Sequence, residues 1–364
     1  MKKKKILVLC PYPKGEAAGQ RLKYEQYFND WEKEGYEITI SSFSDLNLWR
    51  SLYSSKNNFI KILGTLRGYI IRIRDLFYLK KNDLIYIFMW VTPFGTTLFE
   101  RLVRFLSKKI IYDFDDAVHL TNHVQNRSLV QKVIGLFRGK NKTNYLIKSS
   151  DHVIVSSPFH VDFCKEKNRK SNCTYIPCSL DGSRFVPSKT KHQNDIPVIG
   201  WTGTFSSKFY LDSLMKVFLE LKKRCDFKLL IIGNFDFTLP NINLEVIKWT
   251  KKNEVQDLQL IDIGIYPLLP DEWGLGKGAL KAIHYMAIGI PLVATDFGTT
   301  SLVVKDKVNG FLVKSEKEWV EALENLIKDI KKRNEFGEKG REIFEFNYST
   351  NVVKNKYLSV LNSL

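Results

Sequence analysis

Residues 262–310 contain the feature that most restricts how this chain can fold. A short apolar run leads into a glycine-rich turn at Gly274, Gly276 and Gly278. A helical pattern follows, and Gly289 ends it before a second apolar run begins. Strand, glycine turn, helix, glycine stop and strand predict a βαβ unit, and the N-terminus of the helix in such a unit commonly binds a phosphate group.

The chain has 364 residues, 44% of them hydrophobic, which suits a globular protein of two domains. No run of about 18 apolar residues is present, so no membrane-spanning helix is expected. The lysine-rich start precedes an apolar run too short for a signal peptide. Five cysteines without metal-binding or Cys-x-x-Cys spacing favour reduced thiols in the cytoplasm.

Short β-branched and aromatic runs alternate with helical patterns in both halves, which predicts an α/β protein with doubly wound sheets. In the first half the expected strands are residues 5–10, 37–42, 83–88, 109–113, 152–156 and 174–177, with helices at 21–34 and 97–106. In the second half the expected strands are residues 197–200, 228–233, 244–247, 261–266 and 292–294, with helices at 210–224, 316–329 and 331–346.

A polar segment with two prolines separates the halves and predicts a linker. We therefore expect an N-terminal domain at residues 1–188 and a C-terminal domain at 189–346. A final amphipathic helix at about 347–364 is expected to pack back on the first domain.

Several segments carry a resemblance when they are taken in order. The first strand is followed by P-Y-P-K-G-E-A-A-G-Q-R, and the linker begins I-P-C-S-L-D-G-S-R-F. The second half opens V-I-G-W-T-G-T-F and continues to D-I-G-I-Y-P-L, H-Y-M-A-I-G-I-P-L-V-A-T and V-N-G-F-L-V. This order resembles the retaining glycosyltransferases of family 4 over essentially the whole chain. The resemblance implies the GT-B architecture, in which two Rossmann-like domains face a central cleft.

The resemblance also implies an activity. It would be hexosyl transfer, with retention of anomeric configuration, from a nucleotide-sugar donor to a saccharide or lipid-linked acceptor in cell-surface polysaccharide or glycolipid synthesis. No metal or other cofactor is expected. The donor phosphates would meet a helix dipole, basic side chains and the backbone amides of Gly276 and Gly278.

Two positions on the donor helix depart from the family pattern. His284 stands where a glutamate usually binds the ribose, and Gly276 stands where another contacts the donor sugar. The alternative function is therefore a non-catalytic protein that binds sugar nucleotides. Lys277 and Lys281 are spaced to share one helix face, where either can contact the diphosphate. Their alternative role is that of ordinary surface lysines.

Further candidate donor-binding residues lie earlier in the second half. Trp201 replaces the arginine that the family usually has, and we expect it in the core or the cleft wall. Gly203 belongs to the same candidate set, and Lys208 is a candidate phosphate ligand. Trp249 lies near the expected position of the nucleotide base and either stacks on the base or packs inside the domain.

The resemblance places the loop after the first strand close to the donor phosphate and sugar. Gly15 and Gly19 lie in this loop, and Arg21 is expected at the start of the next helix. The alternative is a plain turn followed by an arginine in solvent.

The fourth strand ends in a carboxylate-rich segment containing Asp115, Asp116 and His119. Because strand carboxyl ends face the ligand in such folds, these are the candidate catalytic residues. Three roles stay open, namely positioning of acceptor or donor hydroxyls, action as a base toward the acceptor, and metal binding. A helix cap is the structural alternative.

Residues 1–190 carry 32 Lys and Arg against 17 Asp and Glu. Residues 48–81 predict a basic amphipathic helix that contacts an anionic membrane surface, so the protein is expected in the cytoplasm or on the inner face of the cytoplasmic membrane. Its basic residues are Arg50, Lys56, Lys61, Arg67, Arg72, Arg74, Lys80 and Lys81. The alternative is a helix packed on the sheet with its basic side in water. A basic nucleic-acid-binding protein is a further alternative that the charge permits, but nucleic acid is not an expected partner, because the aromatic side chains lie in the apolar stripe and no RNA or DNA module is visible.

Overall fold

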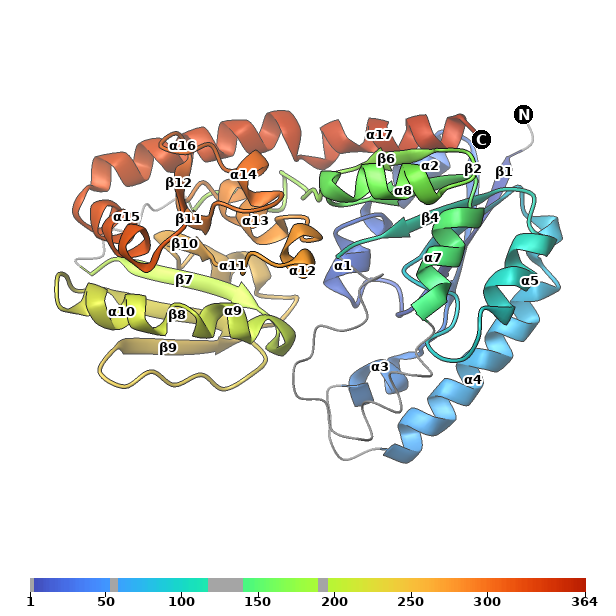
Figure 1. The fold of residues 1–364 in the computed structure, drawn as a ribbon, viewed down its shortest axis with the longest axis horizontal. Helices are drawn as coiled ribbons and strands as arrows, with labels where there is room; N and C mark the ends of the chain where they lie inside the picture. Colours follow the sequence, from blue (N-terminus) through green and yellow to red (C-terminus); the bar gives the residue numbers. More distant parts are fainter. Residues whose placement is uncertain (1–2, 53–57, 117–139, 189–195) are drawn as a thin grey trace. The chain divides into compact units, whose positions relative to one another are not determined.

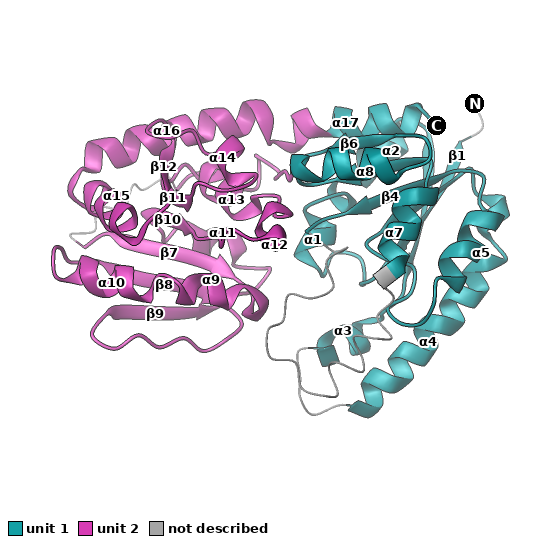
Figure 2. Ribbon diagram, viewed as in Figure 1, with its two compact units in different colours: residues 1–177, 354–364 teal, residues 178–353 magenta. Residues whose placement is uncertain are grey.

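The structure, a computed structural model, describes residues 3–52, 58–116, 140–188 and 196–364. The chain divides into two compact units, shown in Figure 2. Unit 1 consists of Met1–Pro177 and Lys354–Leu364, and unit 2 consists of Cys178–Val353.

Unit 1 is built on a six-stranded parallel sheet with the order β2-β1-β3-β4-β5-β6. Its strands are β1 Lys4–Cys10, β2 Tyr36–Ser42, β3 Leu84–Phe88, β4 Ile110–Phe114, β5 His152–Val155 and β6 Cys173–Tyr175. Its helices are α1 Ala18–Arg21, α2 Phe28–Lys33, α3 Leu46–Leu52, α4 Asn58–Leu76, α5 Leu98–Leu106, α7 Lys140–Ser149 and α8 Val161–Lys167, with the 3-10 turns Glu25–Tyr27, Leu79–Lys81 and Pro158–His160 (Figure 1).

Unit 2 repeats this plan with a second six-stranded parallel sheet, ordered β12-β11-β10-β7-β8-β9. Its strands are β7 Val198–Gly203, β8 Lys228–Gly233, β9 Asn243–Lys248, β10 Ile263–Tyr266, β11 Leu292–Thr295 and β12 Gly310–Val313. Its helices are α9 Lys208–Asp212, α10 Met215–Lys222, α11 Glu254–Leu258, α12 Glu272–Leu275, α13 Leu280–Ala287, α14 Thr300–Val303, α15 Glu316–Lys328 and α16 Ile330–Asn347, with the 3-10 turn Phe205–Ser207.

Both sheets contain strands that are apolar and buried on both faces, as is typical of parallel sheets covered by helices. Every residue of β3, β4 and β10 is buried, and helices supply apolar side chains to the cores. A strand buried on both faces needs a continuous apolar run, so these segments were recognisable in the sequence. The doubly wound α/β architecture that the sequence predicted is confirmed.

The first part of the linker, from Cys178 onward, belongs to unit 2. Arg341 of α16 donates to the carbonyls of Gly182 at 3.0 Å and Phe185 at 2.5 Å. Arg184 pairs with Glu254 of α11 at 2.7 Å. These contacts explain why the units divide after Pro177, whereas the sequence placed the boundary near residue 188.

The chain returns to unit 1 at its end. Helix α17 spans Thr350–Asn362, and its part from Lys354 onward belongs to unit 1. There Tyr357 is buried, with its ring 5.0 Å from that of Tyr27 and 5.9 Å from that of Trp31.

The helix expected at 21–34 is broken into three pieces. Helix α1 ends at Arg21, a 3-10 turn covers Glu25–Tyr27, and α2 begins at Phe28. Arg21 therefore ends a short helix instead of starting a long one. The side chain of Glu25 helps to explain the break, because it accepts hydrogen bonds from Gly15 N at 2.7 Å and from Gln20 at 3.0 Å.

Candidate functional site

Helix α13 lies close against the sheet of unit 2. A Cβ atom on Gly264 of β10 would come within 2.5 Å of the Tyr285 ring, so only glycine fits beneath this helix. The Tyr285 hydroxyl donates toward the carbonyls of Gly200 at 3.2 Å and Ile265 at 3.4 Å. These contacts fix α13 across β7 and β10, near the carboxyl edge where ligands bind in open α/β sheets.

The start of α13 differs from the expectation. Helix α12 ends at Leu275, and α13 begins only at Leu280, after Ala279 in a left-handed conformation with φ 55°. The amide of Gly276 donates to Trp273 O and that of Lys277 to Gly274 O, both at 3.1 Å. The Gly276 amide thus closes the turn of α12, and its expected phosphate-binding role stays a prediction.

Lys281 projects from the first turn of α13 toward the carboxyl ends of two central strands. Its Nζ lies 5.5 Å from the ring centroid of Trp201 in β7 and 5.5 Å from that of Tyr266, the last residue of β10. These faces attract the ammonium group by cation–π interactions. The structure thus places a cation at the centre of this edge, beside the first-turn amides of α13.

The spacing of Lys277 and Lys281 predicted that they share one helix face, but they do not. Lys277 lies between α12 and α13, and its Nζ is 5.1 Å from the ring centroid of Trp273. The left-handed residue at 279 turns the chain between the two lysines, so the periodicity of a helix does not apply to them. Gly278 lies in the same connection.

His284 lies one turn after Lys281 and is buried. Its Nδ1 is 2.9 Å from Leu280 O, and its ring meets Phe185 edge-on with centroids 5.3 Å apart. The residue that replaces the expected glutamate is thus packed against Phe185 of the linker.

The other candidates of unit 2 surround this edge at different depths. Trp201 is 1% exposed and belongs to the core, as expected. A Cβ on Gly203 would come within 2.3 Å of the Trp201 ring, so this glycine leaves room for the indole. Lys208 pairs with Asp212 at 2.7 Å, and Trp249 follows the edge strand β9 with its amide bonded to Gly233 O at 3.1 Å.

The loop after β1 in unit 1 is stabilised by hydrogen bonds with Gln20 and Glu25. Gln20 accepts from the amide of Tyr12 at 2.9 Å and donates to its carbonyl at 3.0 Å. Gly15 has φ 80°, a conformation that favours glycine. Its amide donates a hydrogen bond to the carboxylate of Glu25. Arg21 is only 8% exposed, so the alternative of an arginine in solvent is wrong.

The structure brings two of the first-domain candidates together. A Cβ on Gly19 would lie 2.8 Å from a carboxylate oxygen of Asp115, which follows β4. Asp116 has φ 52° and is half-buried. His119 lies outside the described residues.

A buried ion pair joins the turn after α1 to β4 and was not among the sequence candidates. Lys23 pairs with Asp113 of β4 and donates to Phe114 O at 2.7 Å. The Tyr86 hydroxyl also donates to Asp113, while burial raises the pKa of that carboxyl. A single lysine outside a motif gives no sequence signal for such a contact.

Arg72 was also missed as a structural residue, because it was counted in the exposed basic face. It is 1% exposed and pairs with Asp75 at 2.9 Å. Its guanidinium donates to Cys10 O at 2.8 Å, Ser41 O at 3.1 Å and Val91 O at 2.8 Å. It therefore ties α4 to the carboxyl ends of β1 and β2 and to the loop after β3.

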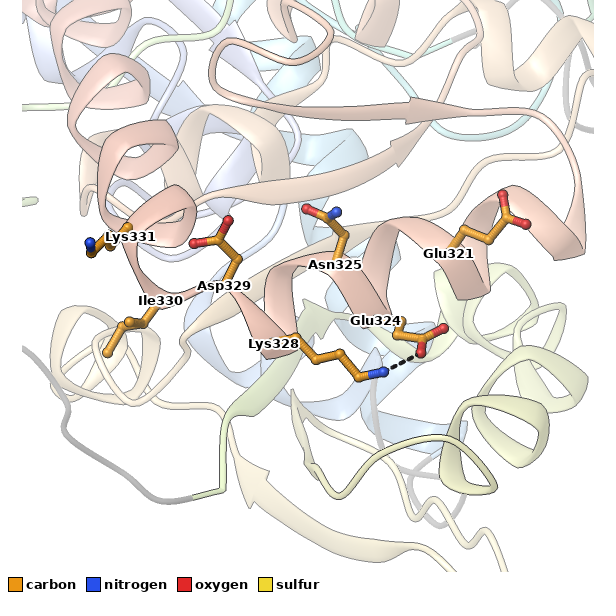
Figure 3. A pocket seen from close by; sticks show the side chains of 7 residues that line it. All are labelled: Glu321, Glu324, Asn325, Lys328, Asp329, Ile330 and Lys331. Atoms are coloured by element: carbon orange, nitrogen blue, oxygen red, sulfur yellow. Dashed lines mark hydrogen bonds and ion pairs between the residues drawn. The ribbon is translucent and has the colours of Figure 1, made fainter.

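Figure 3 shows a depression on α15 and the start of α16, which is separate from the edge that bears Lys281. It is lined by Glu321, Glu324, Asn325, Lys328, Asp329, Ile330 and Lys331. The nearby Arg333 interacts with Asp262, which accepts from the amide of Val198 at the start of β7 at 2.8 Å. The depression is therefore near the amino ends of the strands, opposite to the edge that bears Lys281.

Within the described ranges, no group of three or more His, Cys, Asp or Glu residues is arranged to hold a metal ion. No helix within them combines the length and the apolar character needed to cross a membrane.

Comparison with solved structures defines the class of fold. The chain is similar to sucrose-phosphate synthase from Thermosynechococcus elongatus, with 14% identity, a TM-score of 0.71 and 99% coverage of both chains. It is similar to a glycosyltransferase from Rickettsia africae, with 15% identity, a TM-score of 0.66 and coverage of 99% and 98%. HepE from Anabaena, solved with UDP and glucose, gives 14% identity, a TM-score of 0.65 and coverage of 99% and 100%. The chain therefore has the GT-B fold.

A sequence comparison matches part of the chain. Residues 183–343, which lie within unit 2, match the family described as Glycosyl transferases group 1. The match includes α13 and all of the unit 2 candidates. No curated protein matches the chain.

Proposed function

We propose that the protein is a retaining glycosyltransferase, a hexosyltransferase that takes its sugar from a nucleotide-sugar donor. The observation that carries the proposal is the position of Lys281, whose Nζ lies 5.5 Å from Trp201 and from Tyr266 at the carboxyl edge of unit 2. This edge belongs to the domain that matches the group 1 family.

Lys281 and the first turn of α13 would bind the diphosphate of the donor. The leaving diphosphate gains negative charge as the bond to the anomeric carbon breaks. A fixed ammonium group and the positive end of a helix stabilise that charge without rearranging during the step. Lys277, Gly278 and Lys208 are proposed to line the same phosphate site.

Retention requires the new bond to form on the face that the diphosphate leaves. In the proposed step the acceptor oxygen bonds to the anomeric carbon, the bond to the phosphate oxygen breaks, and that phosphate oxygen takes the acceptor proton. No metal is assigned a role in this step.

The remaining candidates of unit 2 are proposed to bind the nucleoside. His284 would take the place of the family's ribose-binding glutamate, with weaker hydrogen bonding than a carboxylate. Trp249 would contact the base, and Gly203 would let the ligand approach the end of β7.

Unit 1 is proposed to bind the acceptor and the donor sugar. Asp115 and Asp116 follow β4, and the approach of Gly19 to Asp115 joins this loop to the one after β1. Carboxylates accept hydrogen bonds from sugar hydroxyls, which suits a positioning role. Gly15 and Arg21 are proposed to complete the loop near the donor.

The structures of HepE with UDP and with UDP-glucose support a nucleotide-sugar donor as the partner. We propose a saccharide or lipid-linked acceptor, in cell-surface polysaccharide or glycolipid synthesis on the cytoplasmic side of the membrane. Residues 48–81 are the proposed contact with that membrane, and nucleic acid is not a proposed partner.

Replacement of Lys281 tests the assignment. Lys281→Ala removes the ammonium group that lies against Trp201 and Tyr266, so we expect turnover to fall by about 100-fold, in the range for one lost electrostatic contact. The measurement is release of nucleoside diphosphate from the active donor. Lys317→Ala is the matched control, because its side chain is 82% exposed on α15. Equal turnover in both variants and the wild type would remove Lys281 from the site.

The non-catalytic alternative predicts binding without transfer. It is favoured by the absence of glutamates at 276 and 284. A protein of this kind would bind nucleoside diphosphates with the same dependence on Lys281 and would form no glycoside with any donor.

A further inference from the structure

Helix α4 turns two glycines and a buried ion pair toward the interior of unit 1. A Cβ on Gly68 would lie 2.5 Å from the Phe43 ring, and one on Gly64 would lie 2.9 Å from Leu48. Arg72 and Asp75 form the buried pair on the same face. The inner face thus packs by close backbone approach and hydrogen bonds, and contributes few large apolar side chains.

The outer face of α4 and the turn after it carries the large apolar side chains. They are Phe59, Leu63, Leu66, Ile70, Ile73 and Phe77, separated alternately by four and three residues. Their exposure ranges from 49% for Leu63 and Ile73 to 76% for Phe77. We call these six residues the α4 stripe. Figure 1 shows α4 along the border of unit 1, with α5 beside it.

This arrangement is the reverse of a packed amphipathic helix, which turns its apolar stripe inward. Single exposed apolar residues are common, but a continuous stripe over five turns marks an interaction surface. The alternative of a helix packed on the sheet with its basic side in water agrees with the exposed Arg67 and Arg74, but in the described part of this segment the exposed side carries the apolar stripe as well.

The charges beside the α4 stripe indicate the chemistry of its partner. Arg67 pairs with Asp45 and Arg74 with Asp75, yet the two arginine side chains stay 62% and 61% exposed, and Lys80 and Lys81 are exposed at the end of the segment. Asp75 is the only acidic residue between 58 and 81, and it is buried with Arg72. The exposed surface of this segment is therefore apolar and cationic.

An anionic phospholipid bilayer fits both properties, because its interface accepts apolar side chains and its head groups attract arginine and lysine. A second copy of this chain would bring the same positive charge to the contact. A nucleic acid would leave the apolar stripe in water.

We infer that the α4 stripe docks the protein on an anionic lipid bilayer, with α4 lying in the plane of the interface. Phe105 on the neighbouring α5 is also a large apolar side chain, 82% exposed. The docking does not depend on the proposed transfer reaction, so binding and turnover can fail separately.

Vesicle co-sedimentation of the full chain tests the inference. The vesicles are phosphatidylcholine alone or phosphatidylcholine with a third phosphatidylglycerol. The wild type should bind the anionic vesicles, with binding weakened by salt. Leu66→Glu/Ile70→Glu should lower the partition coefficient at least about tenfold, because two apolar groups no longer enter the interface.

Ile330→Glu/Phe346→Glu is the matched control. It makes the same change in charge at two exposed apolar residues of α16 in unit 2, which are 50% and 80% exposed. Thermal melts should show both variants folded, and Leu66→Ser/Ile70→Ser provides a milder second test. The inference is overturned if the control loses binding as strongly, if neutral vesicles bind equally well, or if the wild type only forms a dimer that the α4 substitutions dissociate.

Discussion

Asp151 shows how one carboxylate can hold several backbone segments of unit 1. It accepts from the amide of Ile110 at 2.8 Å, from Arg104 at 2.6 Å and from Lys170 at 2.5 Å. Burial alone would raise the pKa of this carboxyl, but the hydrogen bonds from Lys170, Arg104 and Ile110 hold the pKa below its ordinary value.

This shift gives a pH-dependent prediction. A carboxyl with a lowered pKa in the folded state stabilises the protein above its unfolded pKa of about 3.9, and the contribution is lost as the pH falls through the folded value. Asp151→Asn should therefore lower the free energy of unfolding by about 1–3 kcal/mol at pH 7. Urea denaturation at pH 7 and near pH 3 measures this, and the deficit should shrink at the lower pH. A deficit that is the same at both pH values would contradict the role of ionised Asp151.

Some residue-scale features were predictable because a motif fixes their place. The glycine in D-I-G-I-Y is needed beneath Tyr285, and the lysine at 281 lies at the start of the helix that follows. The contacts of Lys23 and Arg72 were not predictable, because their partners are far away in the sequence. Asp113 lies 90 residues from Lys23, and Cys10 lies 62 residues from Arg72. Sequence periodicity predicts which residues of one helix or strand share a face, but it does not predict contacts with residues far away in the sequence.

At the scale of elements, α4 depends on Arg72 for its position. Arg72→Met would leave Asp75 buried without its guanidinium partner and would remove donors from three backbone carbonyls. We expect a loss of about 3–5 kcal/mol in the free energy of unfolding, the usual cost of breaking a buried pair. Chemical denaturation measures the change.

Arg74→Met is the control for this prediction, because Arg74 also reaches Asp75 but is 61% exposed. Its loss should cost no more than about 1 kcal/mol. If the two substitutions cost the same, Arg72 does not anchor α4 in the way the hydrogen bonds indicate.

The elements also show where helical patterns mislead. The sequence predicted one helix from the glycine turn to Gly289, but the left-handed Ala279 divides it and separates Lys277 from Lys281. A backbone reversal at a non-glycine residue leaves little trace in hydrophobic periodicity. The buried strands were found more easily, because a parallel strand covered on both faces is apolar at every position.

At the scale of the whole molecule, the two parallel sheets and the return of α17 to unit 1 give the GT-B fold at 14% identity to sucrose-phosphate synthase. The order of motifs predicted this fold because each motif marks one loop at a strand end. It could not identify the donor sugar or the acceptor, since those depend on side chains that differ among proteins of the same fold.

The proposed function is the transfer of a sugar from a nucleotide donor with retention. The most direct measurement incubates the full chain with UDP-, GDP- and ADP-hexoses and simple saccharide acceptors, and follows the anomeric proton of the product by NMR. We expect one nucleotide class to be consumed and the new linkage to keep the anomeric configuration of the donor. A product with inverted configuration would contradict the proposed mechanism, and binding of a nucleoside diphosphate with no glycoside from any donor would contradict the enzymatic function.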